Sequence, residues 1–422
     1  MNQIAVSSDK ISSVVKYTQD AINVISKISK DSNLAVLNSL LKPTREITVQ
    51  VPVRLDNGDY HSFKGFRVQH NDARGPFKGG LRFHPSVTID EARILAHLMS
   101  LKTSVANIPY GGAKGGIACN PKELSLRELE SLTRNFTTAI ADNIGPLKDI
   151  PAPDVNTNAQ IMAWIVDEYS KGRSKQYGVV TGKPIELGGS LGRDEATGRG
   201  VMYVVRELSK DKGLKLTDAK VVFQGFGNLA YAGAKLIEKE LGSCIVGVSS
   251  SAGAVYNKKG LNLDKAHDYY LKHNSLKGLP DCEFMTNEEL LLSDCDILIP
   301  SALENAINKN NAKKIKAKVL VEGANDCTTF EADNILNDQG VLVVPDILAN
   351  AGGVIVSYFE WVQNLNNYYW SLSKVRSELD NSMVNAYDEV ANTAKHHGLT
   401  MRMAAYVVAI QKIAKAITLR GV

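Results

Sequence analysis

The sequence is short of cysteine and of long hydrophobic runs. Its 422 residues include only five cysteines, and none of them form a Cys-x-x-Cys pair. This pattern argues against a disulfide framework or a zinc site and predicts reduced thiols in the cytoplasm. No apolar stretch approaches the length of a membrane span, and the first residues lack the apolar core of a signal peptide. We therefore expect a cytoplasmic protein with no bound metal and no membrane partner.

An excess of charge of one sign is also missing. The chain has 49 Lys and Arg residues against 45 Asp and Glu residues, which leaves a net charge of +4. No basic run interleaved with aromatic residues stands out, so the charge pattern predicts no nucleic-acid partner. An apolar content of 44% with 22% charged residues is typical of a folded soluble protein, and the length favours two domains.

Two kinds of periodicity divide the chain. The first part is mixed: residues 11–41 have apolar side chains at helical spacing, whereas residues 48–53 and 60–69 alternate around a turn, as in a β-hairpin. The second part alternates short apolar runs with helical segments, which is typical of a doubly wound parallel sheet. Residues 358–422 again have a helical pattern. The strands predicted in the second part are 220–224, 244–248, 296–300, 318–321 and 341–344.

A glycine-rich turn follows the first of these strands. The pattern Gly225-x-Gly227-x-x-Ala230 is a dinucleotide fingerprint. The first glycine makes a tight turn, the second lets a pyrophosphate approach the backbone, and the third, small residue lets helix and strand pack. The phosphates then meet the N-terminus of a helix predicted at 231–241. The alternative is a strand-to-helix turn that binds nothing.

The end of the second strand lacks the carboxylate that usually holds a ribose 2′-hydroxyl. Residues 249–251 are all serine. A 2′-phosphate is then not repelled, hydroxyls such as that of Ser250 can donate to it, and Lys258 or Lys259 is expected nearby. We predict that the protein accepts NADP, alone or together with NAD.

Three lysines lie in or near glycine-rich segments, which we interpret as loops. Lys78 precedes two glycines, and Lys114 lies between two glycine pairs. Glycine lets a ligand approach the backbone and leaves the ammonium unshielded. Lys102 follows Met99 by three residues, on the same face of a helix that Thr88 is expected to cap. An anionic small molecule suits this set, and ordinary surface lysines are the alternative.

Further polar residues stand just before predicted helices. Asp154 follows Pro-Ala-Pro in an apparently rigid loop and is either a functional carboxylate or a helix N-cap. Arg193 and Thr197 lie at a helix start, where Arg193 has a structural alternative as an anchor for that helix. Asn350 opens a small-residue loop that leads to Ser357, which taken alone indicates a packing residue.

Together these segments resemble the hexameric glutamate dehydrogenases of the short-subunit type found in archaea and bacteria. The resemblance runs from near residue 40 to the C-terminus. It implies reversible oxidative deamination of L-glutamate to 2-oxoglutarate and ammonium, with hydride transfer to NAD(P), by a homohexamer. The motifs that carry it are, in order, GPFKGGLRFHP, PYGGAKGG, PAPDV, RDEATGRG, GFGN, EGAN and NAGGVIVSYFEWVQN.

The resemblance also implies roles at matching positions. Lys114 matches the catalytic lysine that activates water, and Asp154 matches the proton-transferring aspartate. Lys78 and Ser357 match the pair on the substrate's side-chain carboxylate. The other implied substrate-binding positions are Met99, Lys102 on the α-carboxylate, Ala152, Asn350 and Val354. The implied cofactor-binding positions are Arg193, Thr197, Gly225, Phe226, Gly227, Asn228, Leu229, Ser250, Ala302 and Asn325.

Two positions depart from the family pattern. Ser250 stands where many relatives have Asp, which leaves the cofactor preference open. Met99 replaces the Gln of some relatives and removes one polar contact to the substrate's carboxylate.

The predicted fold is α/β with two domains. Residues 1–182 form a mixed α/β substrate-binding and oligomerisation domain. Residues 183–355 form a Rossmann-like dinucleotide-binding domain with a doubly wound parallel sheet. Residues 356–422 form C-terminal helices that pack back on the first domain.

Two other functions remain open at this point. A dehydrogenase for leucine, valine or phenylalanine would share Lys102, Lys114 and Asp154, but an apolar side chain needs no cation at its far end. Lys78 with Ser357 therefore favours glutamate. A nucleotide-binding sensor without catalysis is the second alternative, and the intact Lys114 and Asp154 argue against it.

Overall fold

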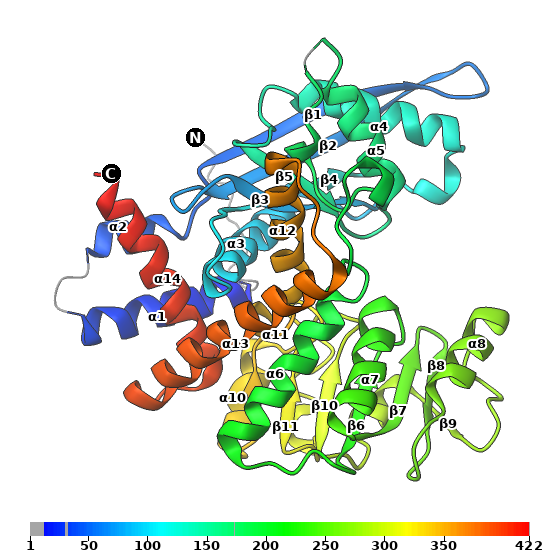
Figure 1. Ribbon diagram of the computed structural model, residues 1–422, viewed down its shortest axis with the longest axis vertical. Helices are drawn as coiled ribbons and strands as arrows, with labels where there is room; N and C mark the ends of the chain where they lie inside the picture. The colour runs from blue at the N-terminus through cyan, green and yellow to red at the C-terminus, as the bar shows by residue number, and fades with distance from the viewer. Residues whose placement is uncertain (1–11, 30–32, 173, 422) are drawn as a thin grey trace, which may run out of the picture.

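The computed structural model describes residues 12–29, 33–172 and 174–421. It has two lobes, each built around one sheet, with helices between and beside them (Figure 1). Residues 1–11, which include the predicted start of the first helix, lie outside the described residues. None of the helices in the described ranges has the length and apolarity needed to cross a membrane.

The first lobe contains a five-stranded mixed sheet with the order β1-β2-β4-β3-β5. β1 and β2 form the predicted antiparallel hairpin, and both extend beyond the predicted ranges. β3 lies parallel to both β4 and β5. The strands are β1 (Arg45–Arg54), β2 (Tyr60–Asn71), β3 (Phe77–Phe83), β4 (Gly112–Ile117) and β5 (Asp149–Pro153).

Three segments that the sequence analysis treated as loops are strands, so that interpretation was wrong. The glycine-rich segments around Lys78 and Lys114 are β3 and β4, and Pro-Ala-Pro before Asp154 ends β5. The glycines serve close strand packing: a Cβ on Gly79 would lie 1.6 Å from the carbonyl oxygen of Ala113. The prolines are tolerated because β5 is an edge strand.

Helices cover both faces of this sheet. α4 (Leu126–Ile140) and α5 (Ala159–Tyr169) pack on the face that carries the buried Leu81 and Phe83. α3 (Ile89–Val105) packs on the opposite face, and the Thr88 hydroxyl accepts a hydrogen bond from the Glu91 N–H (3.2 Å), as expected for its N-cap. Charged side chains that belong to the site therefore share the α3 face.

The second lobe contains a seven-stranded sheet with the order β12-β11-β10-β6-β7-β8-β9. The five predicted strands are present and parallel, which confirms the doubly wound sheet. Two antiparallel strands at one end of the sheet, β8 and the edge strand β9, were not predicted. The strands are β6 (Lys220–Gln224), β7 (Cys244–Ser250), β8 (Gly253–Tyr256), β9 (Glu283–Met285), β10 (Ile297–Pro300), β11 (Val319–Val321) and β12 (Leu342–Val344).

Helices flank this second sheet. They are α6 (Ala196–Lys212), α7 (Asn228–Leu241), α8 (Leu263–His273), α9 (Asn287–Leu291), α10 (Phe330–Asp338) and α11 (Asp346–Ala349). α7 begins three residues before the start predicted for it, directly at the glycine turn. The first helices of the chain are α1 (Ser13–Ile28) and α2 (Leu34–Ser39).

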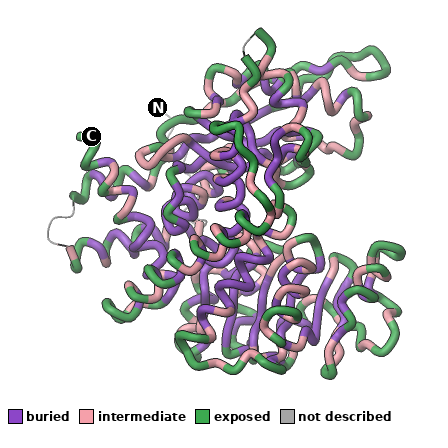
Figure 2. Tube along the Cα trace, viewed as in Figure 1, coloured by how far each residue is buried: buried purple, intermediate pink, exposed green. Residues whose placement is uncertain are grey.

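The C-terminal segment is helical, as predicted. It consists of α12 (Gly352–Asn366), α13 (Leu372–His397) and α14 (Met401–Leu419). α14 packs against α1 and α3 of the first lobe, and α13 packs against α6 of the second. One cluster of buried residues runs through these helices, α1, α3 and the second sheet, and the helices are buried along much of their length (Figure 2), so the C-terminal helices join the second lobe to α1 and α3 of the first. The exact domain limits at 182 and 355 stay predictions.

Candidate active site

Lys114 and Asp154 meet across the first sheet. Lys114 on β4, Gly80 on β3 and Ala152 on β5 stand side by side in register. Because Gly80 has no side chain, Lys114 can pass over β3; a Cβ on Gly80 would lie 2.8 Å from Oδ2 of Asp154. The Lys114 ammonium donates to that oxygen and forms an ion pair with it. The structure thus brings the two predicted catalytic residues together.

Asp154 is held as a carboxylate from two sides. Its Oδ1 accepts hydrogen bonds from Nε of Arg82 (3.0 Å) and from the backbone N–H of Val155 (2.7 Å). Burial alone would raise the pKa of Asp154, but the cations of Lys114 and Arg82 outweigh it and hold that pKa well below its ordinary value.

Lys78 lies on the same face of β3, two residues before Gly80, and only 1% of it is exposed. Its ammonium donates to the carbonyl of Ile150 (3.2 Å). Burial, and then the neighbouring cations Arg67 and Arg193, lower its pKa well below the ordinary value. An anion that binds beside Lys78 would stabilise the charged form of this lysine.

The starts of α6 and α12 lie beside each other. A Cβ on Gly353 would stand 2.5 Å from Oγ1 of Thr197 and 3.6 Å from Nη1 of Arg193. The Ser357 hydroxyl donates to the Gly353 carbonyl (3.0 Å). Nε of Arg193 is buried and has no hydrogen-bond partner among the described residues. The resemblance implied a cofactor position for Arg193, which stays a prediction; the charge of Arg193 also acts on Lys78 and lowers its pKa.

Lys102 connects the two lobes. From α3 it donates to Oδ1 of Asn325 (2.7 Å), which also accepts from Nδ2 of Asn350 (3.0 Å). Burial lowers the pKa of Lys102 to about 8, and Lys114 adds to that effect. Met99 lies three residues earlier on α3 and is half-buried. The predicted residues of both lobes therefore meet at this contact.

Ala152 and Val354 are apolar residues close to these charges. Ala152 pairs with Gly80 in the sheet and is 8% exposed. Val354 is half-buried on α12, between Gly353 and Ser357 in sequence. Both positions are compatible with lining a pocket beside Lys78.

The glycine turn after β6 lies at a topological switch point. β6 is followed along the chain by β7 on one side, and β10 lies on the other. Gly225 has φ +116°, and a Cβ on it would lie 3.1 Å from the Ser301 carbonyl and 3.2 Å from Cβ of Ala302. In doubly wound sheets, ligands bind at such a point.

The turn is open beside its second glycine. No described atom lies within 4 Å of a Cβ built on Gly227. α7 begins at Asn228, and within the described ranges no side chain caps its first N–H groups. Free N–H groups and the positive end of a helix suit a phosphate. Phe226 is buried beneath the turn, and Leu229 packs close to Gly323.

Ser250 ends β7, as predicted, and its hydroxyl donates to the Gly253 carbonyl (3.2 Å). The expected cations Lys258 and Lys259 are not near it, so that prediction was wrong. β8 runs antiparallel to β7 and returns the chain to the other end of the sheet. There the N–H of Asn257 donates to the carbonyl of Val246 (2.8 Å).

The sequence analysis missed three charged residues at the site. Arg82 contacts Asp154, forms an ion pair with Glu91, and lies 3.9 Å from Glu304 of the second lobe. Alternation on a strand would have placed Arg82 on the face of Lys78, but the segment was interpreted as a loop. Glu304 carried no local signal, since its partner is distant in sequence.

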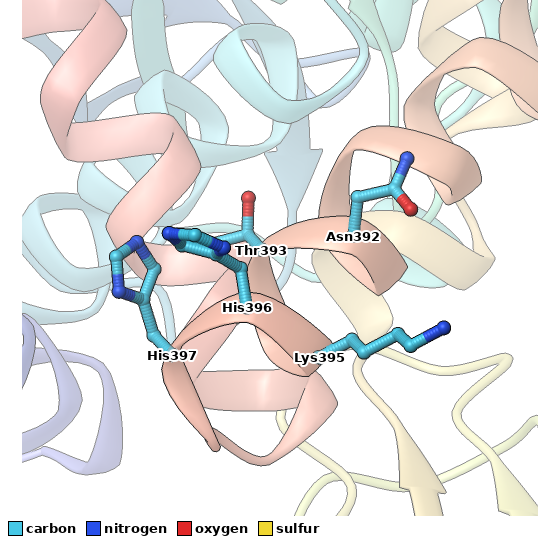
Figure 3. A pocket seen from close by; sticks show the side chains of 5 residues that line it. All are labelled: Asn392, Thr393, Lys395, His396 and His397. Atoms are coloured by element: carbon cyan, nitrogen blue, oxygen red, sulfur yellow. The ribbon is translucent and has the colours of Figure 1, made fainter.

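Other parts of the described structure bring fewer functional groups together. In the described part of the chain, no group of three or more His, Cys, Asp or Glu side chains is arranged to hold a metal ion. An open surface cavity of about 710 Å³ lies at the end of α13 (Figure 3). All the residues that line it come from that one helix: Asn392, Thr393, Lys395, His396 and His397. It brings together no groups from different elements.

A doubly wound sheet with a free phosphate turn, facing a Lys–Asp pair and two further buried lysines, defines the class of dinucleotide-dependent oxidoreductases. Two family models agree with this class. "Glutamate/Leucine/Phenylalanine/Valine dehydrogenase" matches residues 188–421, and "Glu/Leu/Phe/Val dehydrogenase, dimerisation domain" matches residues 43–171. The chain therefore belongs to the Glu/Leu/Phe/Val dehydrogenase family.

Individual relatives are similar over nearly the whole chain. A glutamate dehydrogenase of Thermotoga maritima is 51% identical over 393 residues, 93% of this chain and 94% of that protein. The catabolic NAD-specific glutamate dehydrogenase RocG of Bacillus subtilis is 49% identical and covers 90% of this chain and 89% of its own. The crystal structure of a hetero-hexameric glutamate dehydrogenase from Thermus thermophilus, in its Leu-bound form, has a TM-score of 0.92 and 39% identity, with 98% of both chains covered.

Proposed function

We propose that the protein is a glutamate dehydrogenase that converts L-glutamate, water and NAD(P)⁺ reversibly to 2-oxoglutarate, ammonium and NAD(P)H. One observation carries the proposal: two buried lysines, Lys78 on β3 and Lys102 on α3, lie on the side of the first sheet that carries the Lys114–Asp154 pair. A dicarboxylate needs two cationic anchors around the reacting carbon. The close glutamate dehydrogenase relatives support the same substrate.

Lys78 and Ser357 are assigned to the substrate's side-chain carboxylate. Arg193 is a third candidate, because its buried Nε lacks a partner among the described residues. Lys102, with Met99 beside it, is assigned to the α-carboxylate. The remaining assigned substrate contacts are Ala152 and Val354 along the carbon chain and Asn350 near the nitrogen.

The protein's own groups handle water and protons. A dinucleotide held by the turn after β6 would supply the acceptor for the hydride that leaves Cα of the substrate, and Cα would then be the carbon of an iminium group. Lys114 removes a proton from water so that its oxygen bonds to that carbon. Asp154, within reach of Lys114, moves protons to and from the nitrogen until the C–N bond breaks and ammonia leaves. Because the protein holds the reacting groups next to one another, the reaction step does not include the entropy cost of bringing them together.

The dinucleotide is assigned to the switch point after β6. Gly225, Phe226, Gly227, Asn228 and Leu229 form the phosphate turn. Thr197, Ala302, Asn325 and Ser250 are assigned positions around it. Since Ser250 presents no carboxylate to a ribose, we propose that both NAD and NADP are used.

The assembly and location follow from other features. We propose a homohexamer, because the Thermus thermophilus relative is described as hetero-hexameric and this chain is similar to it throughout. The five cysteines are free thiols, which supports a reducing cytoplasm.

Substrate preference tests the proposal. Wild-type protein should oxidise L-glutamate far faster than L-leucine or L-phenylalanine. Lys78→Leu should lower kcat/KM for glutamate about a hundredfold or more, because one buried ion pair is lost, while the rate with apolar amino acids stays equal or rises. An unchanged preference in Lys78→Leu would contradict the dicarboxylate assignment.

A further inference from the structure

Arg82 is the point where three carboxylates from three elements meet. Its Nε donates to Oδ1 of Asp154 (3.0 Å). Its Nη1 forms an ion pair with Glu91 of α3 and lies 3.9 Å from Oε1 of Glu304. The Arg82 and Asp154 side chains are 17% and 18% exposed, so water screens their contact only in part, whereas Glu304 is 49% exposed.

The partners of Arg82 belong to different lobes. Asp154 and Glu91 belong to the first lobe, whereas Glu304 follows β10 in the second. Glu304 is two residues after Ala302, which lies against the glycine turn at Gly225. A planar guanidinium can hold several carboxylates at once, which a lysine ammonium does less well. Nη1 of Arg82 is therefore shared between Glu91 of the first lobe and Glu304 of the second.

We propose that Arg82 is a positioning residue that ties the orientation of the Asp154 carboxylate to the approach of the two lobes through Glu304. This inference rests on the proposed function. Arg82 fixes one oxygen of Asp154, so that the other faces Lys114 and the reacting nitrogen. Through its contact with Arg82, Glu304 makes the orientation of the Asp154 carboxylate depend on the position of the second lobe.

The charges around Asp154 determine what loss of Arg82 would do. Lys114 from β4, Arg82 from β3 and the Val155 N–H stabilise its charged form, and Lys102 from α3 is a further nearby cation. Removing Arg82 withdraws one of these cations while burial remains. The pKa of Asp154 then rises, and the acidic limb of the rate profile moves to higher pH.

Three variants separate the two functions of Arg82. Arg82→Gln should lower kcat about ten- to a hundredfold, with KM for 2-oxoglutarate changed by less than about threefold, and should move the acidic limb of kcat up by about one pH unit. Arg82→Lys should restore most of the pH limb but not the rate. Glu304→Gln should leave the pH limb in place and lower kcat/KM about two- to fivefold, as for one partly exposed ion pair.

Glu283→Gln is the matched control, because Glu283 is an exposed glutamate of the same lobe on β9. An unmoved acidic limb in Arg82→Gln, or Glu304→Gln behaving as Glu283→Gln does, would overturn the inference. If Arg82→Gln lacks the wild-type melting transition, Arg82→Lys and Glu304→Gln decide the question. Inactive wild-type protein would instead overturn the proposed function, so the two failures are distinguishable.

Discussion

At the scale of single residues, the site holds lysine side chains away from water. Lys78 and Lys102 are both buried, and burial lowers the pKa of each. Keeping such groups charged costs free energy that a bound carboxylate returns. The same residues would therefore bind an apolar ligand weakly, because such a ligand has no charge that stabilises the two ammonium groups.

Lys102 should make substrate binding depend on pH. Its pKa is lowered to about 8, so the ammonium loses its proton as the pH rises through that value. KM for 2-oxoglutarate should therefore increase between pH 8 and 9.5. Lys102→Arg, which stays charged, should have a flatter KM profile even if its KM is higher. Identical profiles in steady-state assays of both proteins would contradict the assignment of Lys102 to a carboxylate.

Ser250 should govern cofactor choice. Ser250→Asp adds a carboxylate where a ribose 2′-phosphate would approach, so kcat/KM for NADPH should fall at least tenfold relative to NADH. Lys259→Gln should leave the ratio unchanged, because Lys259 lies at the other end of the sheet. An altered ratio in Lys259→Gln and none in Ser250→Asp would place the ribose elsewhere.

At the scale of elements, a strand that has a glycine at one position makes the catalytic pair possible. β3 lies between β4 and β5, and Gly80 is the residue over which Lys114 reaches Asp154. Gly80→Ala should lower kcat about a hundredfold, because its Cβ would displace the Asp154 carboxylate. Gly178→Ala is the control, since its Cβ would meet atoms only at 3.4 Å or more. Rates near wild type in Gly80→Ala would show that the pair does not need this passage.

β2 and α3 are joined by a pair of buried histidines. The rings of His70 and His97 stack with centroids 4.4 Å apart, and His70 contacts Ser100 (2.8 Å) and the Leu40 carbonyl (3.0 Å). Burial lowers the pKa of His70 to about 4 and that of His97 well below its ordinary value. Both rings are therefore neutral in the folded protein at neutral pH.

This pair predicts loss of stability in mild acid. In the unfolded chain histidine titrates near pH 6.5, so protons favour unfolding as the pH falls from about 6.5 towards 4. For His70 the effect reaches on the order of 3 kcal/mol. Urea unfolding between pH 7.5 and 4.5 should show a smaller acid loss in His97→Gln than in wild type. The control His61→Gln, at an exposed position, should keep the wild-type slope; equal slopes in all three would contradict the explanation.

At the scale of the whole molecule, periodicity predicted most of the second lobe but less of the first. Strands β6 and β10 to β12 are short apolar runs, so their sequences indicated them directly. β3 and β4 are rich in glycine and carry lysines, which locally resembles a loop. Their strand form depends on neighbours such as Ala113 and Phe66, whose carbonyl oxygens leave no room for side chains.

The site was predictable to the same extent. Lys78, Lys114 and Asp154 stand in recognisable motifs, and the structure brings Lys114 and Asp154 into contact. Arg82 required knowledge that its segment is a strand, and Glu304 required knowledge of how the lobes meet. The wrong position expected for Lys258 and Lys259 has a similar cause, because β8 reverses the chain direction and a strand of four residues leaves a weak pattern.

The activity of the two lobes together gives the most direct test of the central claim, that the protein is a glutamate dehydrogenase. Nicotinamide absorbance should be followed with 2-oxoglutarate and ammonium, in parallel with NADH and NADPH. We expect oxidation that requires both substrates and occurs with each cofactor, and that is lost in Lys114→Ala. Folded wild-type protein that oxidises neither cofactor, or that works equally well with a branched-chain 2-oxo acid, would contradict the claim.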